Sequence, residues 1–153
     1  IARTVVYLIS MLFDLDFPRA FPSLNISAIF RQQPEDFFVD EQLDFALSGH
    51  GEHWCLHIEK IGQNTVFVAK QLAEWAGIKQ MDVGYCGLKD RHAVTRQWFS
   101  LYLGKRELNL SSLKIEGCTV LAVSQHECKL RLACTQAMRL SFVCAMCRVL
   151  WMR

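Results

Sequence analysis

Residues 54–77 read WCLHIEKIGQNTVFVAKQLAEWAG, and they predict a strand followed directly by a helix. The first seven, WCLHIEK, alternate between apolar and polar side chains, which is the period of a strand that packs on one face. The apolar set is Trp54, Leu56 and Ile58, and the polar set is Cys55, His57 and Glu59. We therefore expect a half-buried strand whose polar face is turned away from the core.

The helix is predicted by its two ends as well as by its middle. Asn64 is a favourable N-cap residue, and Gly77 is a favourable residue just after a last turn. The apolar side chains that recur between them at helical spacing are Phe67, Val68, Leu72, Trp75 and Ala76. We expect these side chains to form the packed face of one helix.

Strand-like segments surround this unit on both sides. Upstream, AIFRQ (28–32) and FFVDEQL (37–43) are separated by a turn at Pro34, which predicts a hairpin. Downstream, apolar or alternating runs predict strands within VGYCG (83–87), QWFSLYL (97–103), SSLKIEGCTVLAVSQ (111–125) and ECKLRL (127–132). The sequence therefore predicts an α+β fold with a mixed or antiparallel sheet and one main helix.

The composition is that of one ordinary globular domain. The chain has 153 residues, of which 52% are hydrophobic and 21% charged, enough to bury a core. A formal charge of +2 creates no global field, so any affinity for nucleic acid has to come from locally placed basic residues. No apolar run approaches the roughly 20 residues of a membrane helix. The seven cysteines are odd in number and irregularly spaced, which favours reduced thiols in the cytoplasm.

A charged cluster stands between two of the predicted strands. Residues 87–98 read GLKDRHAVTRQW, in which Asp90 is surrounded by Lys89, Arg91 and His92. Neighbouring cations lower the pKa of an Asp, so we expect Asp90 to stay ionised, as a nucleophile or a charge stabiliser must. A surface cluster of ion pairs would have the same pattern. The residues alone leave both interpretations open.

Three blocks of the chain resemble the TruD family of tRNA pseudouridine synthases. GLKDRHAVTRQW is similar to the family signature, roughly Gly-x-Lys-Asp-Lys/Arg-x-Ala-x-Thr-x-Gln. RQQPEDFFVDE (31–41) resembles the family's Pro-Glu-Asp-Phe block, and GHGEHWCLHIEKIGQNT (49–65) resembles the block between the other two. The blocks follow the family's order. The resemblance covers residues 13–132, which correspond to the N-terminal part of the catalytic domain of a family member.

The resemblance implies a reaction and a nucleophile. Asp90 matches the carboxylate that attacks a flipped uridine at C1′ or C6. The uracil then detaches, rotates and is rejoined to the sugar through a carbon–carbon bond, without cofactor or metal. The implied partner is tRNA, with a uridine of the D-arm region as the target.

Four further residues are candidates for contact with RNA. Phe37 matches a substrate-contacting Phe, and Arg31 lies near a basic residue that family members often carry. An aromatic face suits an extruded base, and a guanidinium suits a phosphate. Lys89 and Arg91 flank Asp90 and would hold phosphates or orient the carboxylate. The plain alternatives are an inward-facing Phe, a solvated strand-end charge and ordinary ion-pair partners. The remaining motif residues, expected to fix the loop by hydrogen bonds, are His92, Thr95 and Gln97.

Two other functions fit parts of the sequence. One is a metal-binding module, suggested by His50, His53, Cys55 and His57. The last three share one face of the predicted strand but lie in a line, so they do not converge on one ion without a ligand from elsewhere. We therefore expect no metal. The other alternative is a fragment that binds RNA without catalysis.

The two ends of the chain differ from the rest. Residues 1–12 match no family block and form an N-terminal extension. Residues 133–153 contain no Asp, Glu, Gly or Pro and fit no element that we can name. Shifted by one nucleotide, their codons can read MHAGNAFELRVRDVSGVVDA, which contains the Gly-Asn-x-Phe that the family carries at this point. We therefore expect a frame error near Leu132, and no activity from the chain as it stands.

Overall fold

The computed structural model describes residues 26–30, 32–107, 109–131, 135–142 and 144–149. The chain divides into two compact units, Ala28–Cys147 and a smaller one formed by Ile1–Ser27 with Arg148–Arg153. Two short strands, β1 (Ile26–Phe30) and β8 (Cys144–Val149), pair with each other as a separate two-stranded sheet. The candidate site lies within the larger unit.

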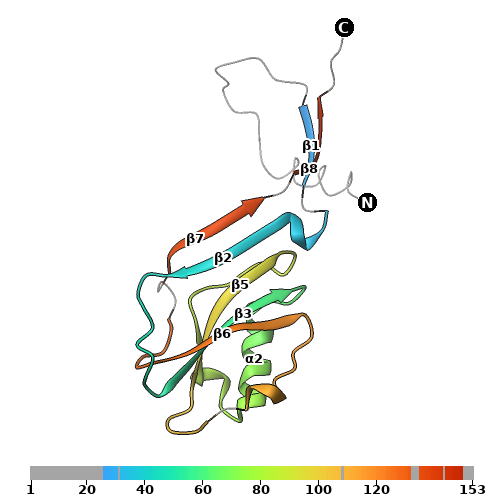
Figure 1. Ribbon diagram of the computed structural model, residues 1–153. Coiled ribbons are helices and arrows are strands. Elements are labelled where there is room, and N and C mark those ends of the chain that lie inside the picture. Colours follow the sequence, from blue (N-terminus) through green and yellow to red (C-terminus); the bar gives the residue numbers. More distant parts are fainter. Residues whose placement is uncertain (1–25, 31, 108, 132–134, 143, 150–153) are drawn as a thin grey trace. The chain divides into compact units, whose positions relative to one another are not determined.

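The larger unit is built on one mixed sheet (Figure 1). Its strands are β2 (Phe37–Leu43), β3 (His53–Ile61), β4 (Val83–Tyr85), β5 (Val94–Tyr102), β6 (Cys118–His126) and β7 (Thr135–Phe142). The order is β6-β3-β5-β2-β7, and β4 also pairs with β5. β2 runs parallel to β5, whereas the other pairs are antiparallel. The expected α+β class is confirmed.

The helix α2 (Thr65–Ala76) begins and ends where the sequence predicts. Asn64 Oδ1 accepts a 2.7 Å hydrogen bond from Phe67 N, which caps the first turn. Gly77 closes the last turn at φ +62°, a left-handed conformation that glycine adopts without strain. Both ends are therefore determined by residues next to the helix.

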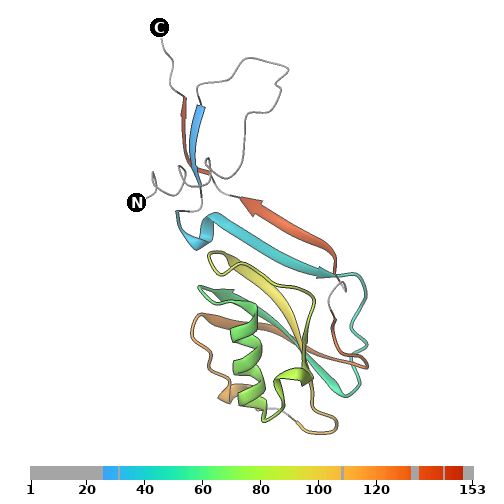
Figure 2. The same cartoon turned by 180° about the vertical axis from the view of Figure 1, so that it is seen from behind.

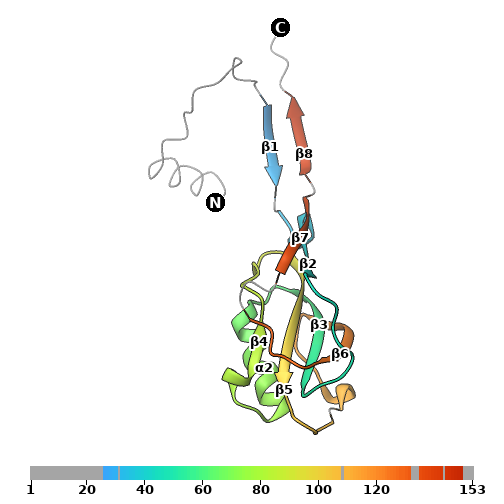
Figure 3. The same cartoon turned by 90° about the vertical axis from the view of Figure 1, so that its left-hand side faces the viewer.

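The core lies between α2 and one face of the sheet, and Figures 2 and 3 show the helix on that side. The helix buries a stripe made of Val68, Ala69, Leu72 and Ala73. This stripe meets Leu56, Ile58, Phe99 and Leu101 of the central strands. The packed face is rotated from the expected one, because Phe67 is 41% exposed. Trp75 is only half-buried, and its Nε1 donates to Ser112 Oγ at 2.9 Å.

Short 3-10 helices connect several of these elements. They are η1 (Pro34–Asp36), η2 (Gln80–Asp82) and η3 (Leu110–Ser112). In η1, Asp36 Oδ2 accepts hydrogen bonds from Gln32 N at 2.8 Å and Gln33 N at 3.1 Å, and so tightens the entry into β2. None of the helices in the described ranges is long and apolar enough to cross a membrane.

Three expectations about the strands are wrong. The hairpin of the first two strands does not form, because β1 pairs with β8 and β2 pairs with β5 and β7. Residues 127–131 form no strand; Leu130 N donates instead to the Ser100 side chain at 2.9 Å. The segment expected to fit no element contains β7 and β8, and Phe142 of β7 lies opposite Phe37.

The expected polar face of β3 is also only partly polar. Cys55 is fully buried, because Cys86 and Leu130 cover it on the side away from α2. On the helix side, the alternation continues inward past Ile58 to Lys60, whose side chain is fully buried as well. β3 is therefore packed on both faces over much of its length, and a charged residue takes one of its core positions.

Candidate functional site

The candidate site is built where two strands share one edge of β5. β2 pairs with residues 94–96 of β5, and β4 pairs with residues 99–101. Between them, a carboxylate replaces a strand partner: Trp98 N donates to Glu41 Oε2 at 2.9 Å. The loop of residues 86–93, called the Asp90 loop below, joins β4 to β5 beside this gap.

Two buried side chains hold the first part of the Asp90 loop. Gln97 Nε2 donates to Gly87 O at 2.6 Å, and Gln97 Oε1 accepts from Thr65 Oγ1 at 2.9 Å. The same Thr65 oxygen accepts from Lys89 N at 2.9 Å. Thr65 and Gln97 are buried, so water does not compete for these bonds. Gln97 thus fixes the loop as expected, whereas Thr95 Oγ1, also buried, has no partner among the described residues.

Lys89 is turned into the protein. Its Nζ lies 2.6 Å from Glu41 Oε1, and the two side chains are 5% and 0% exposed. With Trp98 N on its other oxygen, the Glu41 carboxylate is hydrogen-bonded at both oxygens. An ion pair buried in this way is expensive to break from one side. The geometry matches the ion-pair alternative for Lys89 and not a contact with an RNA phosphate.

Asp90 is exposed, in contrast to the residue before it. Its Oδ1 accepts a 2.9 Å hydrogen bond from His92 N, the local turn that an Asp side chain makes with the backbone two residues on. Its main-chain carbonyl accepts from Lys60 Nζ at 3.0 Å. The exposed Asp90 carboxylate is therefore carried on a backbone that the buried Lys60 ammonium holds in place.

Lys60 is the functional candidate that sequence reasoning missed. Its ammonium lies within hydrogen-bond distance of three carbonyl oxygens, those of Gln63 (2.8 Å), Lys89 (3.4 Å) and Asp90 (3.0 Å). Burial lowers the pKa of Lys60 to about 8. The sequence contains a signal for its burial, because the alternation that turns Leu56 and Ile58 inward also turns Lys60 inward.

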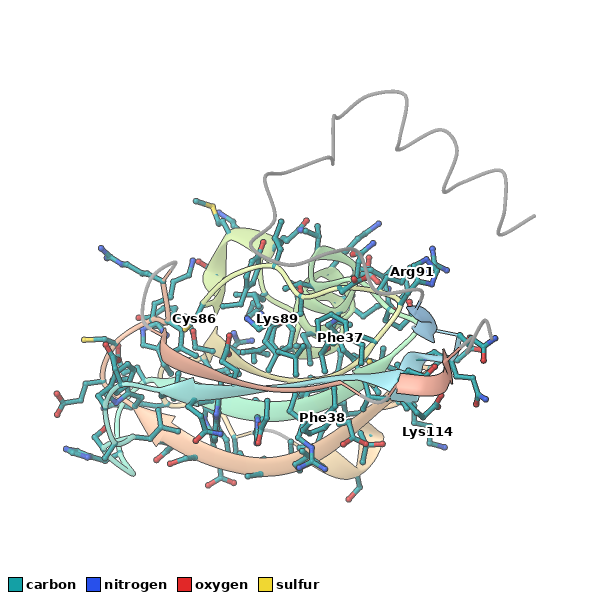
Figure 4. All side chains as sticks on the ribbon, turned by 90° about the horizontal axis from the view of Figure 1, so that it is seen from above. Phe37, Phe38, Cys86, Lys89, Arg91 and Lys114 are labelled. Carbon is teal, nitrogen blue, oxygen red and sulfur yellow. The ribbon has the colours of Figure 1, made fainter. Side chains whose placement is uncertain are left out.

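The other candidates for RNA contact are placed differently from one another (Figure 4). Arg91 is exposed, and its Nε donates to Gly62 O at 2.8 Å. Phe37 is half-buried at the start of β2, on the same side of the sheet as Lys89. Phe38 lies on the opposite side. Arg31 lies outside the described residues.

The face of the sheet opposite the Asp90 loop has its own polar and aromatic contacts. The His57 ring stacks on Trp98 with centroids 4.6 Å apart, and the guanidinium of Arg96 lies 5.0 Å from the centre of the Phe38 ring. Burial lowers the pKa of His57, against a smaller opposite effect of Asp40. None of these side chains contacts the Asp90 loop through a described hydrogen bond, so they stay outside the candidate site.

The possible metal ligands are dispersed. His50 Nε2 pairs with Glu127 Oε1 at 3.1 Å, whereas His57 Nε2 lies 3.6 Å from Asp40 Oδ1. Burial raises the pKa of the Cys55 thiol to about 12, which opposes the thiolate that a metal would require. Within the described part of the chain, no group of three or more His, Cys, Asp or Glu side chains is arranged to hold an ion.

Comparison with known proteins gives one consistent result. The family model for tRNA pseudouridine synthase D (TruD) matches residues 22–136. The tRNA pseudouridine synthase D of Cellvibrio japonicus is 52% identical over 123 residues. That of Methylococcus capsulatus is 50% identical over 117 residues. These alignments cover 78% and 76% of this chain but only 37% and 33% of the relatives, so the chain spans about a third of their length.

The fold agrees with a solved structure as well. The crystal structure described as tRNA pseudouridine synthase D from Methanosarcina mazei superposes with a TM-score of 0.63 at 18% identity. The match covers 76% of this chain and 27% of that one, and it supports the likeness of fold. From the extent of the family match, together with the identity to its members, the chain belongs to the TruD family of tRNA pseudouridine synthases.

Proposed function

We propose that this chain is the N-terminal part of the catalytic domain of a tRNA pseudouridine synthase, with Asp90 as the nucleophile. The observation that carries the proposal is the contrast within the Asp90 loop: an exposed carboxylate on a backbone held by buried partners. Covalent catalysis requires a carboxylate that the substrate can reach and that is held in a fixed position. The TruD membership supplies the reaction class.

In the proposed reaction, Asp90 attacks the extruded uridine at C1′ or C6, and the bond between N1 and C1′ breaks. The uracil rotates, a bond forms between C5 and C1′, and the bond from Asp90 to C1′ or C6 breaks, which returns the carboxylate. The proton displaced from C5 leaves and N1 regains one. No external oxidant or reductant is needed, since the reaction is an isomerisation. The target atoms are inaccessible in a stacked helix, so base extrusion has to precede attack.

For the substrate contacts, we propose tRNA as partner and a D-arm uridine as target. Phe37 lies on the side of the sheet that faces the Asp90 loop, which supports a role against the extruded base. Arg91 is exposed beside Asp90 and is suited to a phosphate. Arg31 stays a prediction from the resemblance. For Lys89, the buried pair with Glu41 supports a role in holding the loop instead.

We also propose that residues 133–153 are read one nucleotide out of frame, and that residues 1–12 are an extension outside the family domain. The shifted reading that restores Gly-Asn-x-Phe supports the first part. Sequencing the gene across the codons for residues 132–138 tests it, since an unbroken frame there would contradict the proposal. The free thiols of Cys55, Cys118 and Cys128 support a cytoplasmic location.

A chimera tests the function without requiring the rest of this protein. Residues 22–132 replace the matching segment of the Cellvibrio japonicus enzyme, and pseudouridine is measured in unmodified tRNA. We expect the chimera to be active and Asp90→Asn to lower kcat by at least about a thousandfold, because a carboxamide is a poor nucleophile. The Kd for tRNA should stay within about threefold, because no phosphate-binding cation is removed.

The matched control is Asp44→Asn, since Asp44 is also exposed but follows β2. It should keep the turnover of the unsubstituted chimera. Full turnover by Asp90→Asn would refute the nucleophile. A chimera that binds tRNA but forms no pseudouridine would favour the non-catalytic alternative. The 153-residue chain, assayed beside the chimera, should form none.

A further inference from the structure

We propose that Lys60 is a positioning residue for Asp90: its ammonium binds the two carbonyls that flank the Asp90 Cα atom and so sets the direction in which the carboxylate projects. This inference rests on the proposed function, in which Asp90 is the nucleophile. The inference gives a function to the buried Lys60 ammonium, which takes no part in the proposed bond-making and bond-breaking steps.

The contacts of Lys60 are distributed on both sides of Asp90. The Lys89 carbonyl, 3.4 Å from Lys60 Nζ, belongs to the peptide bond before Asp90. The Asp90 carbonyl, 3.0 Å away, belongs to the peptide bond after it. Fixing both peptide planes sets the direction of the Asp90 Cα–Cβ bond, and the bond from His92 N to Asp90 Oδ1 restrains the side chain beyond it. A nucleophile misplaced by about 1 Å can lose about a hundredfold in rate, so this restraint bears directly on turnover.

The other end of Lys60 is firmly anchored. Its backbone lies in β3, opposite Thr95 of β5 and Cys118 of β6, and its side chain is 0% exposed. The third contact of the ammonium, to Gln63 O at 2.8 Å, joins it to the turn between β3 and α2. Arg91 reaches the same turn through Gly62 O. The Asp90 loop is thus tied to the β3–α2 turn from both sides of Asp90.

The contact set matches the protonated form of Lys60. Three carbonyls surround the nitrogen, and only an ammonium has three N–H donors. Burial lowers the pKa of Lys60 from 10.5 to about 8; Cys118, when it is ionised, and Asp90 act in the opposite direction, and Lys89 adds to the lowering. Burial raises the pKa of Cys118 to about 11, so that thiol stays neutral when Lys60 loses its proton. The three-donor contact is therefore lost as pH rises through about 8.

Stability responds to this titration with the opposite sign. The folded pKa of Lys60 lies below the unfolded one, so the unfolded chain binds more protons between pH 8 and pH 10.5. The contribution of Lys60 to folding stability accordingly rises with pH across this window. A lysine with a merely structural role would not lower kcat while stability increases, and the two readouts therefore separate positioning from folding.

The test uses the active chimera, its Lys60→Met variant and a matched control, Lys70→Met. Lys70 lies on the exposed side of α2 and contacts only the neighbouring Glu74, at 3.8 Å, among the described ion pairs. We expect kcat of the unsubstituted chimera to fall as pH rises through about 8. In Lys60→Met, kcat should be lower by about a hundredfold at pH 7 and should lose this alkaline decline, with KM within about threefold. Lys70→Met should behave as the unsubstituted chimera.

A direct measurement of the Lys60 pKa, which needs no substitution, accompanies these assays. NMR titration of the Lys60 side chain in the unsubstituted protein gives its pKa, which should coincide with the midpoint of the alkaline decline in kcat. A midpoint displaced by more than about one pH unit would overturn the positioning role. So would a Lys60→Met chimera whose kcat stays within about threefold at pH 7. An unsubstituted chimera that forms no pseudouridine refutes the proposed function instead, so the two failures are distinguishable.

Discussion

The helix α2 and the Asp90 loop are close in the structure, yet their shapes have different origins. The ends of α2 are set by Asn64 and Gly77, which directly adjoin it. The Asp90 loop is held by Glu41, Lys60 and Thr65, which precede their loop partners by 48, 30 and 24 positions. A regular element can therefore be specified locally, whereas the placement of the candidate nucleophile depends on long-range contacts.

The largest effect is expected from breaking the buried ion pair of the loop. Lys89→Met leaves the Glu41 carboxylate buried without its cation, which typically lowers the free energy of unfolding by about 3–5 kcal/mol. Urea denaturation of the 153-residue chain measures this change. Lys114→Met, at an exposed position, is the matched control and should change the free energy by less than about 0.5 kcal/mol.

A double variant sharpens this result. Glu41→Gln removes the uncompensated charge but keeps an oxygen that can accept from Trp98 N. The combination of Glu41→Gln with Lys89→Met should therefore recover about 1–3 kcal/mol relative to Lys89→Met alone. If the double variant loses as much free energy of unfolding as the two single variants added together, Glu41 and Lys89 do not stabilise the loop as a pair.

An intermediate effect is expected where helix and loop meet. Thr65→Val keeps the shape of the side chain but leaves Lys89 N and Gln97 Oε1 without the hydroxyl that joins them. Leaving buried polar groups unpaired should cost about 1–3 kcal/mol, measured by the same denaturation. Thr119→Val, exposed on β6, serves as the control. Equal stability of the two variants would mean that the Thr65 hydroxyl does not support the loop.

The smallest effect is expected at the first turn of α2, which an adjacent residue caps. Asn64→Ala removes the acceptor of the 2.7 Å bond from Phe67 N, and losing such a cap typically costs about 1 kcal/mol. Asn64→Asp restores a capping oxygen and should be near neutral in denaturation. Hydrogen exchange should show faster opening at the first turn of α2 and little change in the Asp90 loop. Equally faster exchange in the Asp90 loop would contradict a local origin of the helix end.

The sequence predicted the elements more successfully than their partners. It located α2 and most of β2, β3, β5 and β6, because capping residues and alternation are local signals. It paired β1 with β2, but the two strands belong to different sheets. It also set Cys55 on a polar face, because the pattern does not reveal which segments cover each side of a sheet. The pairing of a strand is a property of the whole chain.

For the candidate site, the motif around Asp90 was recognisable from residues 87–98 alone, and its assignment as nucleophile stays a prediction. Lys89 illustrates the limit of such reasoning. In the sequence it is one more cation beside Asp90, available to RNA; in the structure its charge is committed to Glu41. The sequence does not show where a lysine side chain points, because the side chain is long enough to reach either solvent or a buried partner.

The α+β class, the limits of α2 and the charged motif around Asp90 could therefore be recognised from the order of the residues alone. Each depends on contacts between residues within a few positions of one another, for which order along the chain is sufficient. Three features became visible only in the folded chain: β2 and β4 share one edge of β5, Glu41 pairs with Lys89 across this gap, and Lys60 binds the Asp90 carbonyl. The two side-chain contacts join residues 48 and 30 positions apart. They form because burying a charge is favourable only where another part of the chain supplies its partners, and the sheet brings those partners together.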